Sequence, residues 1–185
     1  TFTTGSGSDV SITDTTAFDL VALTANSLTA SAGGALTASG TLAITGLADL
    51  TGSTITINDS FDAGTLTFNS AGAVTISENS DSGLAGTSTA LSLDLDSTGT
   101  ITDADTASLT VTNLADLAGT SITLGDHAST DTLNLGTLTF NSAGAVTISE
   151  NSDSGLAGTS AALSLDLDSP GAITDADTAS LTVTN

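Results

Sequence analysis

Residues 64–113 read GTLTFNSAGAVTISENSDSGLAGTSTALSLDLDSTGTITDADTASLTVTN, and residues 136–185 repeat this stretch of fifty residues almost unchanged. The three differences are Thr89 to Ala161, Thr98 to Pro170 and Thr100 to Ala172. Gly64 of the first copy matches Gly136 of the second, and a period of this size is typical of solenoids and tandem arrays. The stretch therefore predicts a fold that is built by repetition.

More divergent matches extend the repeat over the whole chain. The tetrapeptide LADL begins one full unit at residue 47 and another at residue 114, and SDVSITD at residues 8–14 matches GAVTISE at residues 72–78. The chain thus divides into a partial divergent repeat, 1–46, and two repeat units, 47–113 and 114–185. We expect one continuous solenoid that was cut from a longer array.

The two full units differ in length at one place. SFDA at residues 60–63 of the first unit is replaced by HASTDTLNL at residues 127–135 of the second. Length variation confined to one place is typical of a surface loop on a regular core. His127 is the only histidine of the chain and lies in this insertion, where a plain surface position is favoured over catalysis or metal binding.

Apolar residues alternate with Thr, Ser or Asp, as in Val74-Thr-Ile76 and Leu93-Asp-Leu95, and Gly, Asn, Asp and Ser separate these runs. This pattern predicts short half-buried β-strands. LTFNSAGAVT at residue 66 and LDLDSTGTIT at residue 93 share one pattern, which divides the last full unit most simply into three rungs of about 24 residues.

We therefore predict an all-β fold, a parallel β-helix of about eight rungs, each of about 19–27 residues and about three short strands. Antiparallel hairpins would also fit the local alternation. They do not explain repeats within repeats.

The charge of the chain excludes several partners. It contains no Lys or Arg and 21 Asp and Glu, which gives a formal net charge of −21. Nucleic-acid binding through phosphate contacts and binding to anionic membranes both need basic residues, so neither is expected. No apolar run reaches the length of a membrane span, so no membrane insertion is expected either.

Two equivalent groups of carboxylates are candidates for a calcium site. Carboxylates without basic partners repel one another, and Ca²⁺ prefers six to eight oxygen ligands. The alternative, which we favour, is a solvated acidic face without a bound ion. The candidate ligands are Asp94, Asp96, Asp103, Asp105, Asp166, Asp168, Asp175 and Asp177.

The composition argues against an enzyme. No nucleophile and base can be paired, since the chain has no Cys or Lys and one His. Paired carboxylates are the groups that cleave glycosides, so a polysaccharide-active β-helix is an alternative, but a catalytic site is normally singular and these acids are duplicated. Outward Thr rows, such as Thr54 with Thr56 and Thr110 with Thr112, resemble ice-binding solenoids, a further alternative.

The units LTFNSAGAVTISE and LDLDSTGTITDADTASLTVTN resemble the strand repeats of large bacterial exoproteins, similar to filamentous haemagglutinin-like adhesins. The resemblance implies a right-handed parallel β-helix and a location outside the cell or on the bacterial surface. It also implies a structural role, as a segment of an extracellular filament that self-associates end to end or laterally. The alternative is the stalk of an adhesin, stiffened by calcium, whose surface or glycan ligand binds elsewhere in the parent protein.

Overall fold

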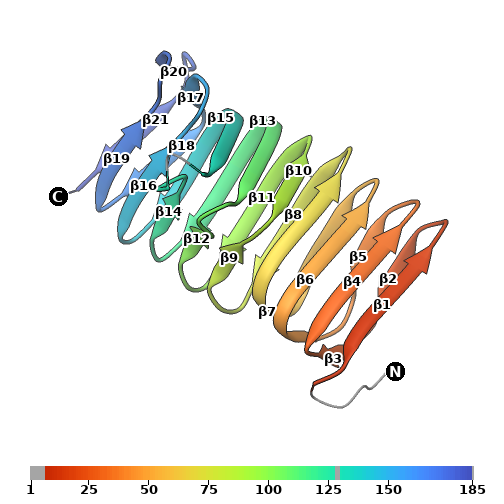
Figure 1. The fold of residues 1–185 in the computed structure, drawn as a ribbon. Coiled ribbons are helices and arrows are strands. Elements are labelled where there is room, and N and C mark those ends of the chain that lie inside the picture. The colour runs from red at the N-terminus through yellow and green to blue at the C-terminus, as the bar shows by residue number, and fades with distance from the viewer. Residues whose placement is uncertain (1–6, 128–129, 185) are drawn as a thin grey trace.

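The computed structural model describes residues 7–127 and 130–184, apart from the side chain of Asp59, and shows a coil of stacked turns (Figure 1). Every element of the described residues is a β-strand, and every strand pairing is parallel. The predicted all-β parallel β-helix is therefore confirmed, with about nine turns. Within the described ranges no helix is long and apolar enough to cross a membrane.

The strands alternate with tight corners, as the turn residues of the sequence predict. In chain order they are β1 (Asp9–Asp14), β2 (Phe18–Leu20), β3 (Leu23–Ala25), β4 (Ser27–Ala32), β5 (Leu36–Ala38), β6 (Leu42–Gly52), β7 (Ile55–Ser70), β8 (Ala73–Glu78), β9 (Ser82–Leu84), β10 (Thr87–Ala90), β11 (Ser92–Ser97), β12 (Ile101–Asp103), β13 (Ser108–Gly119), β14 (Ile122–Leu124), β15 (Thr132–Ser142), β16 (Ala145–Ser149), β17 (Ser154–Leu156), β18 (Thr159–Ala162), β19 (Ser164–Asp168), β20 (Ile173–Asp175) and β21 (Ser180–Val183).

The first turns have three sides. Side one stacks β1, β4, the end of β6 and the end of β7; side two stacks β2, β5 and the start of β7; side three stacks β3, the start of β6 and the middle of β7. On side two the register partner of Phe18 is Leu36, and later in the coil the partner of Ala115 is Leu138. These turns take 18 and 23 residues, and a later turn, in which Val146 pairs with Leu165, takes 19. The first is one residue shorter than the predicted range of about 19–27 residues, and the other two lie within it.

The core is a continuous column of inward apolar side chains. Leu, Ile, Val and Phe at alternate strand positions are buried from Val10 to Ala162, and they include Ile55, Leu66 and Phe68, which are fully enclosed. No single turn could bury this surface alone, because each inward side chain packs against the turns before and after it. The alternation in the sequence is thus the alternation between core and solvent.

The sequence repeat does not coincide with a whole number of turns. Leu66 lies on side one, where its partner is Leu84 of β9, and side one continues through β12 and β14. The equivalent residue of the next unit, Leu138, lies on side two beside Ala115. One sequence unit therefore makes three turns and about two thirds of a further one, which corrects the predicted three rungs, and nearly identical sequences occupy different sides of the coil.

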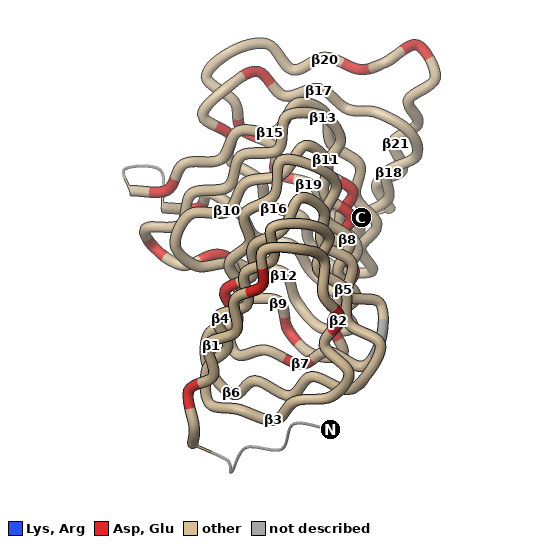
Figure 2. The backbone as a smooth tube through the Cα atoms, turned by 90° about the vertical axis from the view of Figure 1, so that its right-hand side faces the viewer, with Lys and Arg blue, Asp and Glu red and all other residues tan. Residues whose placement is uncertain are grey.

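One side is lost and another is gained along the coil as a result. Side three stacks Leu23, Leu42 and Phe61 and ends at Glu78 of β8. A new side, side four, stacks β10, the start of β13 and the start of β15. Figure 2 shows the coil from the side of its N-terminal end, with β3 and β6 at the bottom of the view and β17 and β20 at the top.

Substitution of Phe61 tests the packing of side three. The equivalent residue of the next unit is Leu133, so leucine is the natural conservative replacement. Phe61 is fully buried, so Phe61→Ala should lower the free energy of unfolding by about 3–5 kcal/mol. Phe61→Leu should cost less than about 1.5 kcal/mol, since it largely conserves apolar volume. Denaturant unfolding of the full chain checks both, and equal losses in the two variants would contradict this packing.

Candidate functional site

One corner of the coil widens from turn to turn. Between side one and side four the chain crosses in residues 85–86, then in residues 104–107, and then in residues 125–131. We call the last segment the corner loop; residues 128–129 within it lie outside the described residues. The insertion predicted as a surface loop, 127–135, forms the end of this loop and the start of β15.

Gly125 fixes the start of the corner loop. Its φ of 70° lies in the left-handed region, and a Cβ added there would lie 2.1 Å from the carbonyl oxygen of Ser149. Its N–H donates to Oδ2 of Asp103 in the preceding turn at 2.9 Å. Only glycine suits this position, and the loop is thereby held against the turn below it.

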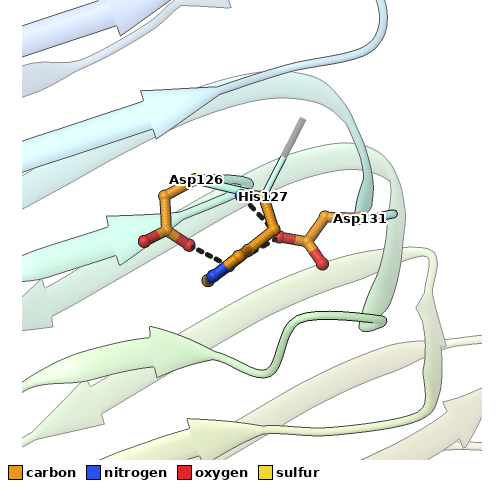
Figure 3. Close-up of side chains that lie close together, drawn as sticks. All are labelled: Asp126, His127 and Asp131. Carbon is orange, nitrogen blue, oxygen red and sulfur yellow. Dashed lines mark hydrogen bonds and ion pairs between the residues drawn. The ribbon is translucent and has the colours of Figure 1, made fainter. Parts of the chain in front are cut away.

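The ring of His127 is surrounded by carboxylates (Figure 3). Its Nδ1 lies 2.9 Å from Oδ1 of Asp126 and 3.6 Å from Oδ2 of Asp131. Its Nε2 lies 3.2 Å from Oδ1 of Asp105, which belongs to the preceding turn. Burial opposes protonation of the ring, but Asp105 and then Asp126 outweigh it and raise the pKa of His127. The corner loop thus gathers acids around the one base of the chain.

Two carboxylates of this corner are buried. The side chain of Asp131 is 1% exposed, and its Oδ2 accepts a hydrogen bond of 3.0 Å from the backbone N–H of His127. Oδ1 of Asp131 and Oδ1 of Asp103 are buried and accept no hydrogen bond. Burial, followed by the charges of Asp131 and Asp126, raises the pKa of Asp103 to about 6.

The candidate calcium ligands lie on separate parts of the coil. Asp103 and Asp105 lie at the widening corner, where Asp103 contacts Gly125 and Asp105 contacts His127. Asp94 and Asp96 lie on β11 of side two. Asp94 is paired in register with Asp116, and the pKa of both is raised, first by burial and then by Asp96. The second group is exposed on β19 and on the last turn: Asp166, Asp168, Asp175 and Asp177.

Calcium binding at these eight residues stays a prediction. In the part of the chain that the structure describes, one group of three potential metal ligands has its ligand atoms within 4.8 Å of one another, namely Asp126, His127 and Asp131. Sequence reasoning favoured a plain surface position for His127 and did not include the two aspartates in a site. The insertion in the repeat was the signal that these residues share one loop.

Two glutamates that the sequence did not lead us to expect in the core are also buried. Glu78 is 2% exposed, and its carboxylate accepts hydrogen bonds from Ala63 N at 2.8 Å and from Ser82 Oγ at 2.6 Å. Glu150 repeats the arrangement with Leu135 N at 3.0 Å and Ser154 Oγ at 2.7 Å. The alternation Val74, Ile76, Glu78 placed this side chain on the inward face and was the available signal.

The buried glutamates hold the backbone where a side of the coil ends. Ala63 N–H lies in the last strand segment of side three, and the carboxylate of Glu78 occupies the place of the carbonyl that a further strand would offer. Burial raises the pKa of Glu78 to about 6 and raises the pKa of Glu150 as well. Their geometry is that of a backbone cap rather than of an open site.

Comparison with known proteins supports the repeat architecture. Residues 7–67 match a family model described as "Repeats of unknown function (DUF5649)". No curated protein and no solved structure matches the chain. The chain is therefore a repeat protein, and the match carries no activity with it.

Stability should fall as pH rises through the titration of Glu78. The folded state favours the protonated carboxyl, so this contribution is fully present below the ordinary pKa of 4.5 and is lost through about pH 6. The loss is at most about 2 kcal/mol. Glu78→Gln should remove this part of the pH dependence, because its amide oxygen still accepts from Ala63 N–H.

Denaturant unfolding between pH 4.5 and 7.5 measures the slope. Asp177→Asn is the matched control, because it removes an exposed carboxylate and should leave the slope of the wild-type protein unchanged. An unaltered slope in Glu78→Gln would show that Glu78 does not titrate in this range.

Proposed function

We propose that the chain is a rod-like structural segment of a secreted extracellular filament or cell-surface fibre. The observation that carries this proposal is the single apolar core, which runs through successive turns from Val10 to Ala162. In such a core each turn contacts mainly its neighbours, so rod length grows with the number of repeats. The near-identity of residues 64–113 and 136–185 supports a role in which length matters more than any single site.

The repeated acids support a mechanical role rather than a catalytic one. Glu78 and Glu150 face the interior and accept hydrogen bonds from backbone N–H groups, so their carboxylates stabilise the fold.

The outward Thr rows are interrupted by acids and amides. In the next turn of the coil Thr75 is followed by Asp94, and Thr110 by Asn134. This interruption does not favour an ice-binding face.

The last turn of the described coil supports end-to-end self-association. Ile173, Leu181 and Val183 in the last turn are 52%, 45% and 43% exposed, whereas the equivalent Ile101, Leu109 and Val111 are buried under a further turn. A strand edge with apolar side chains beside it pairs readily with another strand. We propose that a further turn of the same kind, including one from a second copy, covers this end.

The setting outside the cell rests on the resemblance to haemagglutinin-like adhesins and on composition. A chain with no Lys or Arg and a net charge of −21 stays soluble through self-repulsion. The same charge disfavours lateral packing of rods unless cations screen it. End-to-end growth is therefore the form of assembly that we propose at low salt.

Rod length should increase in fixed steps when copies of residues 114–185 are appended after Asn185. One unit adds about three and two-thirds turns, which at about 4.8 Å per turn is about 18 Å. Negative-stain electron microscopy and small-angle scattering of chains with one, two and three added units measure this increment. Compact particles whose longest dimension does not grow would contradict the structural role.

A further inference from the structure

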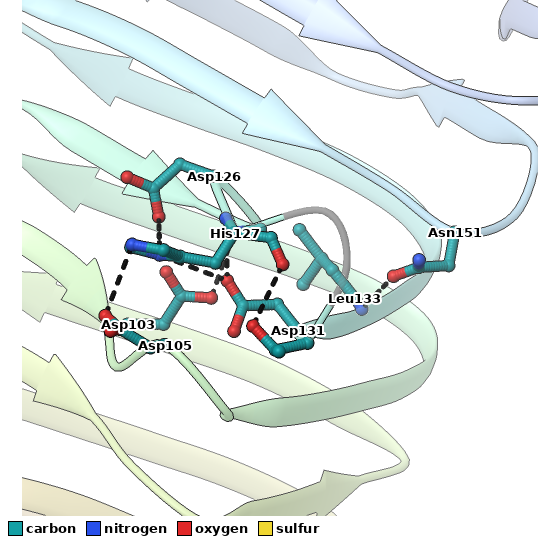
Figure 4. A network of polar contacts seen from close by, with 9 residues as sticks. Asp103, Asp105, Asp126, His127, Asp131, Leu133 and Asn151 are labelled. Atoms are coloured by element: carbon teal, nitrogen blue, oxygen red, sulfur yellow. Dashed lines mark hydrogen bonds and ion pairs between the residues drawn. The ribbon is translucent and has the colours of Figure 1, made fainter.

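We propose that Asp126, His127 and Asp131 bind one divalent transition-metal ion of the zinc type at the corner loop. The three side chains come from one segment, and Asp105 of the preceding turn contacts the same imidazole ring (Figure 4). The site differs from the predicted calcium ligands, because it contains a nitrogen donor and occurs once.

The spacing of the ligand atoms suits a tetrahedral ion. Bonds of about 2.1 Å from a metal to nitrogen and oxygen place neighbouring ligand atoms of a tetrahedron about 3.4 Å apart. Nδ1 of His127 lies 2.9 Å from Oδ1 of Asp126 and 3.6 Å from Oδ2 of Asp131. Displacements of a few tenths of an ångström would therefore open the contact with Asp126 enough to admit the ion.

Asp131 carries a buried carboxylate oxygen that lacks a partner. Its side chain is 1% exposed, and Oδ1 is buried without a hydrogen-bond donor. Burying a carboxylate oxygen without a partner is unfavourable, and the same holds for Oδ1 of Asp103 on the facing turn. The chain has no Lys or Arg to provide the charge, and a metal ion that Asp131 binds through both carboxylate oxygens would give Oδ1 a partner.

Asp105 places the imidazole in the orientation that metal sites use. Nε2 of His127 lies 3.2 Å from Oδ1 of Asp105, which leaves Nδ1 directed at Asp126 and Asp131. A ligating histidine characteristically donates its other ring N–H to a carboxylate, which fixes the tautomer and makes the ligand nitrogen more basic. Asp105 is thus a positioning residue of the site.

The mixed donor set selects the class of ion. Imidazole nitrogen with carboxylate oxygen suits Zn²⁺ and its first-row neighbours, whereas Ca²⁺ takes oxygen ligands in larger number. The bound ion would tie both ends of the corner loop together and, through Asp105, would join it to the turn below. It would stiffen the widest corner, where the chain departs most from the regular coil.

Titration calorimetry of the full chain, first stripped with a chelator, tests this site with zinc chloride, manganese chloride and calcium chloride as separate probes. We expect one equivalent of Zn²⁺ and a rise in melting temperature of several degrees, with weaker Mn²⁺ binding and still weaker Ca²⁺ binding. His127→Ala should weaken Zn²⁺ binding at least tenfold while circular dichroism remains that of a β-sheet protein. Because the ring is 44% exposed, its removal should not unfold the coil.

Asp175→Asn with Asp177→Asn is the matched control. These residues are the repeat equivalents of Asp103 and Asp105 but lie exposed on the last turn, and their loss should leave zinc binding unchanged. Ring ¹⁵N shifts should show that zinc binds Nδ1. The proposal would be overturned by many weak equivalents that persist in His127→Ala, by tighter binding of calcium than zinc, or by no saturable heat.

Discussion

Parallel hydrogen bonding between successive turns is the constraint on which the rest of this structure depends. Each strand shares its register with the turn before and the turn after, as Val74 does with Ile55 and Leu93. Because side chains alternate between faces, a slip of one residue would turn every inward side chain outward. The register is therefore fixed on the sides, and differences in length are absorbed at corners such as the corner loop.

The repeat can run out of phase with the turns because all sides make the same demand. A side needs alternating apolar residues, and LTF of residues 66–68 meets this need on side one as LTF of residues 138–140 does on side two. As a consequence, one side of the coil ends in every sequence unit. Where a side ends, backbone N–H groups lose the strand that would have accepted their hydrogen bonds. The carboxylate oxygens of Glu78 and Glu150 accept these hydrogen bonds instead.

Alternation and repetition in the sequence were enough to predict the parallel β-helix, because both follow directly from stacking of inward residues. The phase of the sequence repeat relative to the turns of the coil could not be predicted. LTFNSAGAVT and LDLDSTGTIT have similar corner residues, but the first begins at Leu66 on side one and the second at Leu93 on side two. The corner cluster was out of reach for a different reason. Asp105 and His127 are far apart in the sequence, and only the stacking of successive turns brings them into contact. In the sequence each residue simply has acidic neighbours of its own.

Cross-linking tests the phase of the coil most directly, and the chain has no native Cys to interfere. Thr75 and Asp94 are register partners in β8 and β11, so their Cα atoms lie about 4.8 Å apart, within the span of a disulfide. Thr75→Cys with Asp94→Cys should form a disulfide on mild oxidation, whereas Thr67→Cys with Asp94→Cys should not. A disulfide in the second pair and none in the first would mean that the signature stretches stack on one another, and that the repeat turns in phase.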